Sequence, residues 1–410
     1  MDDSEFKHWP RVIVLADMNA FFASIEQVDH PNWRTRPVAI TNGKIGTCII
    51  TCSYQARAFG VKTGMHIKQA RMLCPELIQT CSRPQRYAEV SSNIMRVLSS
   101  FTPDLEIFSV DEAFLDMSLH RQLWQSPEQL GKAIKRAIYE VSGVLSSVGI
   151  SADKSTAKVA AKEHKPDGLS IIPPDEVKSY LAPKPLTDLC GVNYGIASHL
   201  AEYDVFTCED LGRMPISVMA KRFGNPGRRI WLMAQGLDPE PVKTQIPDIQ
   251  TLGHGKVLPP NCQDINAILT FLRHMAHKVG ERLRRNQLAA DQFLIGFRLY
   301  SNWMKTKLST PLPCDDDTVI YRLGRHWLEQ HWRGQGIWQI HIVALNPKEC
   351  RQPDLFLRKH PARLKTHQVL DAINQKYGSM TLSSARLINK STMPDVISPA
   401  WKPSGARKTI

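Results

Sequence analysis

Two acidic stretches, each attached to an apolar run, lie far apart in this sequence. Asp17 ends the apolar run of residues 12–16, and the pair Asp111 and Glu112 stands between the apolar residues of 105–108 and 113–117. Short apolar runs of this kind predict buried strands. If the acids are to act together, the fold must place two strands side by side that a long stretch of chain separates. That requirement predicts a sheet with carboxylates at neighbouring strand ends.

The acid pair allows two interpretations. Neighbouring side chains of an extended chain point to opposite faces, so Asp111 and Glu112 can bind one metal ion only if the backbone bends between them. The simpler interpretation is a hairpin turn with solvated acids. Asp17 favours a metal site, because Mg²⁺ takes carboxylate oxygens and two such ions about 3.5–4 Å apart stabilise the attacking and leaving oxygens of phosphoryl transfer. Asp116, which follows a further apolar run, we interpret as structural.

Composition narrows the classes of protein. At 410 residues the chain predicts more than one domain, and its formal net charge of +13 favours a polyanionic partner. The nine cysteines are scattered without the spacing of a zinc site, which predicts reduced thiols. No apolar run approaches the length of a membrane span, so we expect no membrane partner.

The residues around the acids resemble a known family. Asp-Met-Asn-Ala-Phe-Phe-Ala (17–23) and Ser-Val-Asp-Glu-Ala-Phe-Leu-Asp (109–116) are similar to the metal-binding motifs of the Y-family, or translesion, DNA polymerases. The stretch from Gly149 to Gly168 is similar to the last palm motif of that family. Residues 62–65 and 70–75 resemble the bacterial DNA polymerase IV branch, whereas the long C-terminal tail resembles the polymerase V branch.

The resemblance implies an α+β multidomain fold, a right-hand polymerase. A ferredoxin-like palm would comprise residues 11–30 and 86–172, and the order of predicted strands and helices there fits this split β-α-β arrangement. Small fingers would comprise 31–85, a helical thumb 173–240, a linker 241–252 and an α/β little finger 253–346. A basic tail would follow at 347–410.

The resemblance also implies a set of active-site residues. Asp17, Asp111 and Glu112 would be catalytic and would bind two Mg²⁺ ions, with Mn²⁺ as a substitute, and Met18 would add its backbone carbonyl. One ion would activate the primer 3′-hydroxyl and the other would hold the triphosphate. Phe22 would be the steric gate against ribonucleotides. Plain core packing is the alternative for both Phe21 and Phe22.

Three further residues would bind the triphosphate of the incoming nucleotide. Tyr54 and Arg57, at i and i+3 of a predicted helix, would contact its oxygens; from the spacing alone, an arginine stacked on a tyrosine at the surface is as good an interpretation. Lys165 would add a point charge. A stripe of basic residues precedes it at helical spacing, and its simpler interpretation is a solvated helix face: Lys154, Lys158 and Lys162.

The resemblance places DNA contacts in the thumb and the little finger. Gly191 and Gly195 would offer amides to a phosphate in a degenerate helix-hairpin-helix, in which Asn193 replaces the second glycine; Asn tolerates positive φ. Arg284 and Arg298 belong to basic residues beside predicted strands. We expect these residues to follow the DNA backbone, with the full set being Arg282, Arg284, Arg285, Arg298, Lys305 and Lys307.

A short peptide in the tail, residues 352–356, resembles the sequence by which bacterial polymerases bind the sliding clamp. Gln352, Leu355 and Phe356 carry the pattern, and a leucine with an aromatic residue suits an apolar pocket. Chance occurrence of five residues is the alternative.

These features together predict a low-fidelity, template-directed DNA polymerase. It would extend primer–template DNA with deoxynucleoside triphosphates past damaged bases, without proofreading. We expect it to act as a monomer and as a mutator of the SOS response. Its expected location is the bacterial cytoplasm, in association with the nucleoid. The alternatives are a catalytically inactive accessory protein of the same fold that joins DNA to the clamp, and another palm-type enzyme such as a nucleotide cyclase. The three intact acids disfavour the first, and the predicted thumb and second basic domain disfavour the second.

Overall fold

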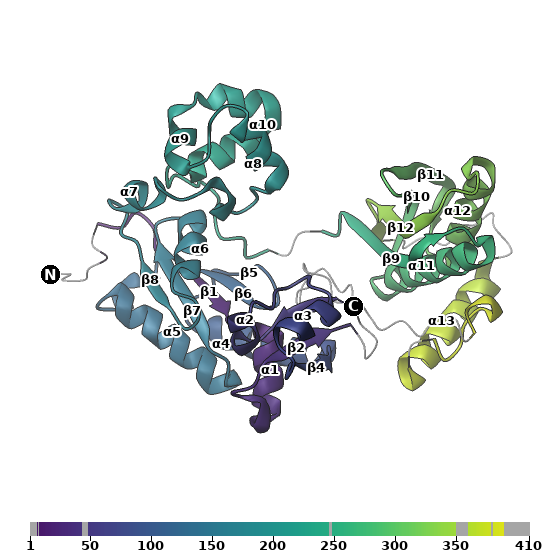
Figure 1. Ribbon diagram of the computed structural model, residues 1–410, viewed down its shortest axis with the longest axis horizontal. Helices are drawn as coiled ribbons and strands as arrows, with labels where there is room; N and C mark the ends of the chain where they lie inside the picture. Colours follow the sequence, from purple (N-terminus) through teal and green to yellow (C-terminus); the bar gives the residue numbers. More distant parts are fainter. Residues whose placement is uncertain are drawn as a thin grey trace. The chain divides into compact units, whose positions relative to one another are not determined.

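The computed structural model describes residue 6 and residues 8–42, 48–245, 248–349, 360–378 and 380–388 (Figure 1). The chain divides into two compact units, and the division falls between residues 246 and 247. The first unit contains the segments predicted as palm, fingers and thumb, and the second contains the segment predicted as little finger.

The palm segment is built on a five-stranded sheet of order β5-β6-β1-β7-β8. Its central strand β1 (Ile13–Met18) is buried along its whole length and pairs antiparallel with β6 (Glu112–Asp116) and β7 (Ser146–Ser151). At the edges, β5 (Leu105–Ile107) forms a hairpin with β6, and β8 (Leu169–Ile171) lies parallel to β7. The order of β1, β5, β6 and β7 with their connecting helices is the predicted ferredoxin-like arrangement.

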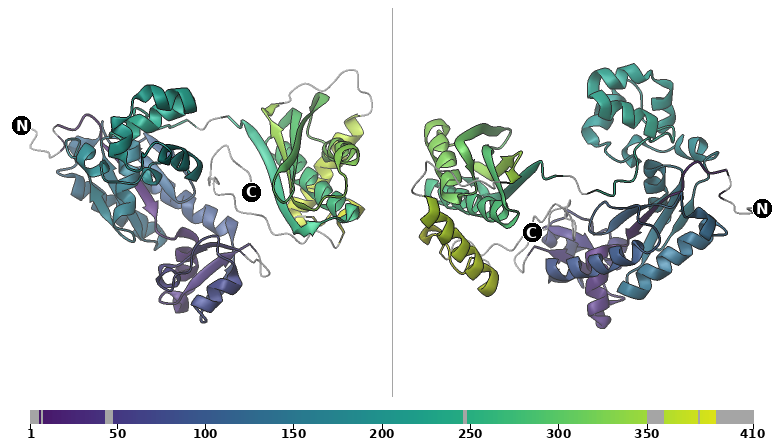
Figure 2. Two further views of the ribbon diagram at one scale, coloured as in Figure 1. Left: turned by 45° about the horizontal axis from the view of Figure 1, so that its top comes forward. Right: turned by 180° about the vertical axis from the view of Figure 1, so that it is seen from behind.

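Helices cover both faces of this sheet. The helices α4 (Pro84–Leu98) and α5 (Pro127–Ser142) lie along one face (Figures 1 and 2), where they share a buried cluster with Val12 and Val14. The helix α6 (Lys154–Glu163) packs on the other face against Ile13 and Leu15. This contact is close because Gly149 has no side chain: a Cβ there would lie 2.1 Å from the carbonyl oxygen of Ala157. Two short elements complete the segment, α1 (Phe21–Asp29) and η2 (Arg121–Leu123).

The fingers segment has a small sheet of its own, in the order β3-β2-β4. Strand β2 (Val38–Thr41) pairs antiparallel with β3 (Ile49–Cys52) and parallel with β4 (Ile78–Cys81). Residues 43–47, which follow β2 in the chain, lie outside the described residues. Three short helical elements flank the sheet, which shares a buried cluster with the last two of them: η1 (Pro31–Trp33), α2 (Tyr54–Ala58) and α3 (Ile67–Leu73).

The thumb segment is helical, as predicted. Its helices bury a common cluster that includes Leu181, Leu200, Leu211 and Met233. Gly224, with φ 63°, interrupts the last helix with a kink. The elements in chain order are α7 (Val177–Leu181), η3 (Leu186–Asp188), α8 (Tyr194–Ala201), α9 (Cys208–Arg213) and α10 (Ile216–Met233).

The second unit consists of a four-stranded antiparallel sheet, ordered β11-β10-β12-β9, with two helices packed together on one face (Figure 1). Alternation along β10 sends Phe293, Ile295 and Phe297 into the core between sheet and helices, and all three are fully buried. The short strand β13 (Lys348–Glu349) pairs with the start of β10. The main elements are β9 (Thr251–Cys262), α11 (Ile265–Arg285), β10 (Leu288–Arg298), β11 (Trp303–Cys314), α12 (Asp317–His331) and β12 (Ile337–Leu345).

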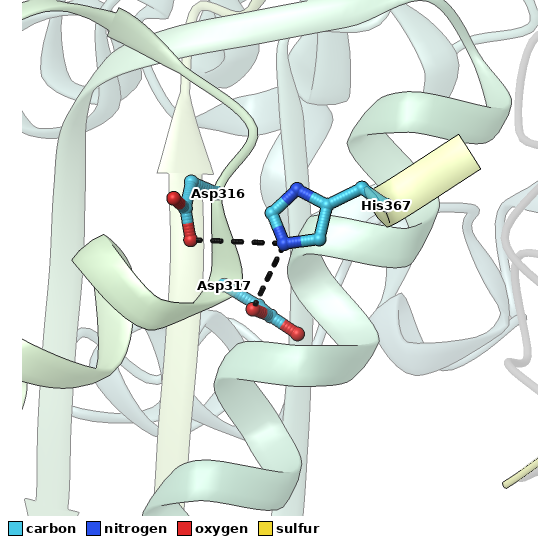
Figure 3. A group of neighbouring side chains, drawn as sticks. All are labelled: Asp316, Asp317 and His367. Carbon is cyan, nitrogen blue, oxygen red and sulfur yellow. Dashed lines mark ion pairs between the residues drawn. The ribbon is translucent and has the colours of Figure 1, made fainter. Parts of the chain in front are cut away.

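Charged contacts attach the helix α13 (His360–Tyr377) to this unit. Arg284 donates two hydrogen bonds to the carboxylate of Asp371, at 2.6 and 2.9 Å. The Nε2 atom of His367 lies 4.0 Å from Asp316 and 3.8 Å from Asp317, which flank the start of α12 (Figure 3). After α13, the turn η4 (Ala385–Leu387) buries Leu387.

Candidate active site

The strand pairing of β1 and β6 brings the two acidic stretches together. Asp17 and Glu112 are directly opposite in the register, so their side chains leave the same face of the sheet. Asp111 lies in a bend immediately before β6. The amide of Met18 donates a hydrogen bond of 2.9 Å to the carbonyl oxygen of Asp111, which holds this bend at the end of β1. The bend that the sequence required between the adjacent acids is therefore present.

The three carboxylates are neighbours without forming a closed cluster. The Asp111 carboxylate accepts a hydrogen bond of 2.6 Å from the hydroxyl of Ser109. Among the described residues, only Asp316, Asp317 and His367 bring three ligand atoms within 4.8 Å of one another. A guanidinium nitrogen of Arg273 already lies 3.4 Å from Asp317 in that group.

Two lysines supply positive charge to the acids on β1 and β6. The ammonium group of Lys165 lies 2.5 Å from Asp17, and that of Lys158 lies 2.7 Å from Glu112. Lys158 also lies 4.2 Å from the centre of the Phe108 ring. Lys165 is thus found on a predicted metal ligand rather than in open solvent, and a triphosphate would have to compete for it. The sequence showed Lys158 only as a member of a basic stripe and gave no sign of its partner.

Burial and these lysines set the pKa values of the three acids. Burial raises the pKa of Asp17 to about 7, although Lys165 acts in the opposite direction. Burial likewise raises the pKa of Asp111. Burial is the largest single effect on Glu112 and opposes its ionisation. The charge and hydrogen bond of Lys158, together with Asp17 and the charge of Lys165, outweigh burial, so the pKa of Glu112 is lowered.

This donor set fits a hard divalent cation. All the side-chain donors are carboxylate oxygens, the ligands that Mg²⁺ prefers. Burial disfavours their charged forms, and the two lysines show that the acids accept a positive charge at this place. The lysines of the basic stripe lie in different environments. Lys154 is buried and pairs with Glu106 at 2.7 Å, whereas Lys162 is exposed and donates a hydrogen bond to the carbonyl of Asp188. A uniformly solvated face is therefore not what the structure shows.

The two candidate gate residues are both in the core. Phe21 is 2% exposed and Phe22 is 8% exposed. The ring of Phe22 stacks on that of Tyr87, with the centroids 4.4 Å apart, and the Tyr87 hydroxyl donates to Glu26 at 2.7 Å. This stacking fixes the orientation of the Phe22 ring, which is compatible with a steric gate and with a core residue.

Tyr54 and Arg57 meet on α2. The guanidinium of Arg57 lies 4.6 Å from the centre of the Tyr54 ring. Ser53 caps this short helix by accepting a hydrogen bond from the amide of Ala56. The surface stack that the spacing allowed is therefore formed, and contact with a triphosphate stays a prediction.

The predicted helix-hairpin-helix turn precedes α8. Gly191 is exposed and has φ +92°, the conformation that favours glycine. Asn193 does not adopt a positive φ: at φ −92° it caps α8 and accepts a hydrogen bond from the amide of Ile196. Gly195 lies exposed in the first turn of that helix. The turn thus differs from the predicted replacement of one glycine by a left-handed asparagine.

Arg284, one of the predicted DNA contacts, already has partners within the chain. Its side chain is only 8% exposed, because Asp371 and the carbonyl of Asp315 bind it, and its contact with DNA stays a prediction. The basic residues also fail to share one face. The arginines of α11 lie on the helical side of the sheet, while Arg298, Lys305 and Lys307 are exposed on its strands. The sequence could not reveal the pairing of Arg284, because its partners Asp315 and Asp371 lie far away along the chain.

Two predictions on partners remain outside this site. The clamp-binding-like residues Gln352, Leu355 and Phe356 lie outside the described residues. Among the helices that the structure describes, none has both the length and the apolar character needed to span a bilayer.

Comparison with known proteins gives the family of the chain. The model of the impB/mucB/samB family matches residues 16–162, and that of its C-terminal domain matches residues 249–355. A DNA polymerase IV of Moorella thermoacetica is 33% identical over 383 residues, which cover 91% of this chain and 95% of the relative. DNA polymerase IV 1 of Bacillus subtilis is 29% identical over 390 residues, 93% of this chain and 94% of the relative.

A solved structure shows the same fold. The Y-family DNA polymerase chimera Dbh-Dpo4(243-245)-Dbh superposes with a TM-score of 0.70 at 24% identity, over 82% of this chain and 98% of the chimera. The two family matches include Asp17, Asp111 and Glu112 and the sheet of the second unit. The chain therefore belongs to the impB/mucB/samB family, and so to the Y-family of DNA-directed DNA polymerases.

Proposed function

We propose that this chain is a translesion DNA polymerase that extends primer–template DNA with deoxynucleoside triphosphates and uses two Mg²⁺ ions. The observation that carries the proposal is the placement of Asp17 and Glu112 opposite each other on β1 and β6, with Asp111 in the adjoining bend. Family membership supports the same reaction. The catalytically inactive alternative has no observation in its favour, since all three acids are present.

In this proposal each segment keeps its predicted role. Residues 11–30 and 86–172 are the palm, 31–85 the fingers, 173–240 the thumb and 253–346 the little finger, joined by a linker at 241–252. A buried cluster centred on each segment supports this division. The clusters meet at the boundaries, since Val38 and Ile40 of the fingers segment join the palm cluster and Val159 of the palm segment joins the thumb cluster. DNA would contact exposed groups of the thumb and little finger, namely Gly191, Gly195 and Arg298.

Asp17, Asp111, Glu112 and the carbonyl of Met18 would hold the metal ions. When bound, the ions supply activation of the primer 3′-hydroxyl and charge for the leaving pyrophosphate. The chain itself then contributes position and electrostatics. Lys165, at 2.5 Å from Asp17, is close enough to the acids to neutralise a triphosphate bound beside them. Lys158 keeps Glu112 ionised and oriented.

Tyr54 and Arg57 would bind the triphosphate from the fingers side, with the arginine orientation fixed by the tyrosine ring. Phe22 would meet the sugar. The fingers segment is small, with one short sheet and helices of at most seven residues. A small fingers domain checks the shape of the nascent base pair weakly, which permits damaged templates and lowers fidelity. We propose that this synthesis proceeds without proofreading.

The tail would connect the enzyme to replication. In this proposal residues 352–356 bind the bacterial sliding clamp, and the protein acts as a monomer on DNA near the nucleoid during the SOS response. The support is the sequence pattern of Gln352, Leu355 and Phe356, which stand in the chain between β13 and α13. A peptide with two apolar anchors suits a small apolar pocket.

Primer extension with Mg²⁺ on an undamaged template tests the active site. We expect Asp111→Ala and Glu112→Ala each to lower the rate by at least about 100-fold, as loss of charge stabilisation at a reacting centre does. Asp116→Asn is the matched control. It lies on the same strand, and its carboxylate accepts hydrogen bonds from Ser118 instead of facing the site. Extension at the parent's rate by both alanine variants would refute the assignment.

A defined lesion in the same template tests bypass. The parent should extend the primer past the damaged base. On an undamaged template, its product should contain more mismatches than the product of a proofreading polymerase. A complete stop at every lesion of a chemically varied panel would refute the translesion assignment and leave the polymerase assignment intact.

A further inference from the structure

The outer face of the sheet in the second unit carries an unusual row of residues. The strand register places Lys305 beside Gly296, Gly296 beside His341, and His341 beside Gly255. Directly opposed residues of antiparallel strands project from the same face. Ile295 and Phe297, the neighbours of Gly296, are fully buried against the helices, so the row faces away from the core.

The two glycines leave room for aromatic rings to lie on the sheet. A Cβ at Gly296 would lie 3.2 Å from the indole carbon Cε3 of Trp303, and one at Gly255 would lie 2.9 Å from Cδ2 of His341. Each ring therefore covers a glycine. The result is a cavity of about 180 Å³ that is open to solvent, with Leu294, Gly296, Trp303, Lys305 and His341 as its lining.

The lining combines an aromatic surface with positive charge. Trp303 is 40% exposed, although it is among the largest apolar side chains of the unit. Lys305 and the neighbouring Lys307 are exposed, and neither takes part in any ion pair that the structure describes. Burial lowers the pKa of His341, so its ring is neutral near pH 7 and offers one hydrogen-bond donor and one acceptor.

We propose that this cavity holds one unpaired base of single-stranded DNA, stacked on Trp303, while Lys305 and Lys307 contact the adjacent phosphates. A flat heterocycle suits a cavity with an indole wall and a glycine floor, and the cationic rim suits a polyanion. Every base has a stacking face, so the contact would not depend on sequence. The inference rests on the proposed function, because that function provides the DNA.

The test compares two single strands that bind the full-length protein. One strand is a run of thymidines, and the other is an abasic sugar–phosphate chain of equal length and charge. Affinity is measured by fluorescence anisotropy of a labelled strand. The parent should bind the strand with bases more tightly. Trp303→Ala should weaken binding to that strand by about tenfold and leave the affinity for the abasic strand unchanged.

Two variants and one control make the test specific. Gly296→Val places a branched side chain on the cavity floor and should remove the same preference. Lys307→Ala should weaken binding to both strands by the same factor. It should also reduce the salt dependence of the affinity by about the amount that one phosphate contact contributes. Val257→Ala is the control: this residue is 64% exposed on the same outer face and lies outside the cavity lining, so binding should equal that of the parent.

Three results would overturn the inference. In the first, the parent binds both strands with equal affinity. In the second, Trp303→Ala still prefers the strand with bases. In the third, Trp303→Ala and Gly296→Val lose affinity equally for both strands. The polymerase assignment is tested separately by primer extension with the parent and Asp111→Ala. A parent that extends primers while Trp303 has no effect on base preference would refute the cavity alone. A parent that neither extends primers nor binds DNA would refute the proposed function.

Discussion

Lys154 provides the sharpest prediction on stability, because it looks like a surface residue in the sequence and is 4% exposed in the structure. Its ammonium group lies 2.7 Å from Glu106, and the same carboxylate oxygen accepts a hydrogen bond of 2.7 Å from the amide of Lys243. Burial lowers the pKa of Lys154 even though Glu106 acts in the opposite direction. The ion pair therefore compensates only part of the cost of burying the lysine.

Replacing Lys154 with methionine should destabilise the first unit by about 3 kcal/mol. Breaking a buried pair from one side costs about 3–5 kcal/mol, because the other charge stays buried without its partner. We expect the lower end of that range, since Glu106 keeps the amide of Lys243 and methionine fills most of the space. The double variant Lys154→Met/Glu106→Gln should recover most of the loss, because glutamine is uncharged and can still accept that hydrogen bond.

Hydrogen exchange of peptides from β6 and α6, followed by mass spectrometry, measures this free energy for the first unit alone. Lys162→Met is the matched control on the same helix, and it should change the protection by no more than about 0.5 kcal/mol. Two outcomes would refute the reasoning: protection of Lys154→Met within about 1 kcal/mol of the parent, or a double variant as unstable as the single one.

Three further predictions concern pH, sugar selection and the clamp. Burial lowers the pKa of His254 from 6.5 to about 3. Because the unfolded chain binds this proton more readily, the contribution of His254 to the stability of the second unit is complete above the unfolded pKa and is lost as the pH falls, by up to about 1.4 kcal/mol per pH unit. Hydrogen exchange at successively lower pH should show this slope in the parent and a smaller one in His254→Gln, and equal slopes would contradict it. Phe22→Ala should increase ribonucleotide incorporation in single-nucleotide extension with Phe21→Ala as the control; unchanged sugar selectivity would identify Phe22 as a core residue. Leu355→Ala with Phe356→Ala should abolish stimulation by the sliding clamp and spare basal synthesis, and clamp-stimulated synthesis at the parent's level would exclude the peptide as the contact.

The local sequence was sufficient for the family and the palm topology. It also singled out Asp17, Asp111 and Glu112, because the proposed two-metal chemistry needs carboxylates and these stand in short motifs that are visible without any knowledge of contacts. The buried strand β1 and the amphipathic helix α4 follow from hydrophobic periodicity, which is also a local property. Even the bend between Asp111 and Glu112 follows from the alternation of side chains along a strand.

Only the tertiary structure decided which charges find partners. Lys154, Lys158 and Lys165 look alike in the sequence, yet they pair with acids 48, 46 and 148 residues away. Arg284 is bound by Asp371, which lies 87 residues further along the chain. The cavity at Trp303 requires two glycines from different strands in one register row. Such contacts depend on how distant strands and helices pack, and no local pattern of residue types encodes a partner at that separation.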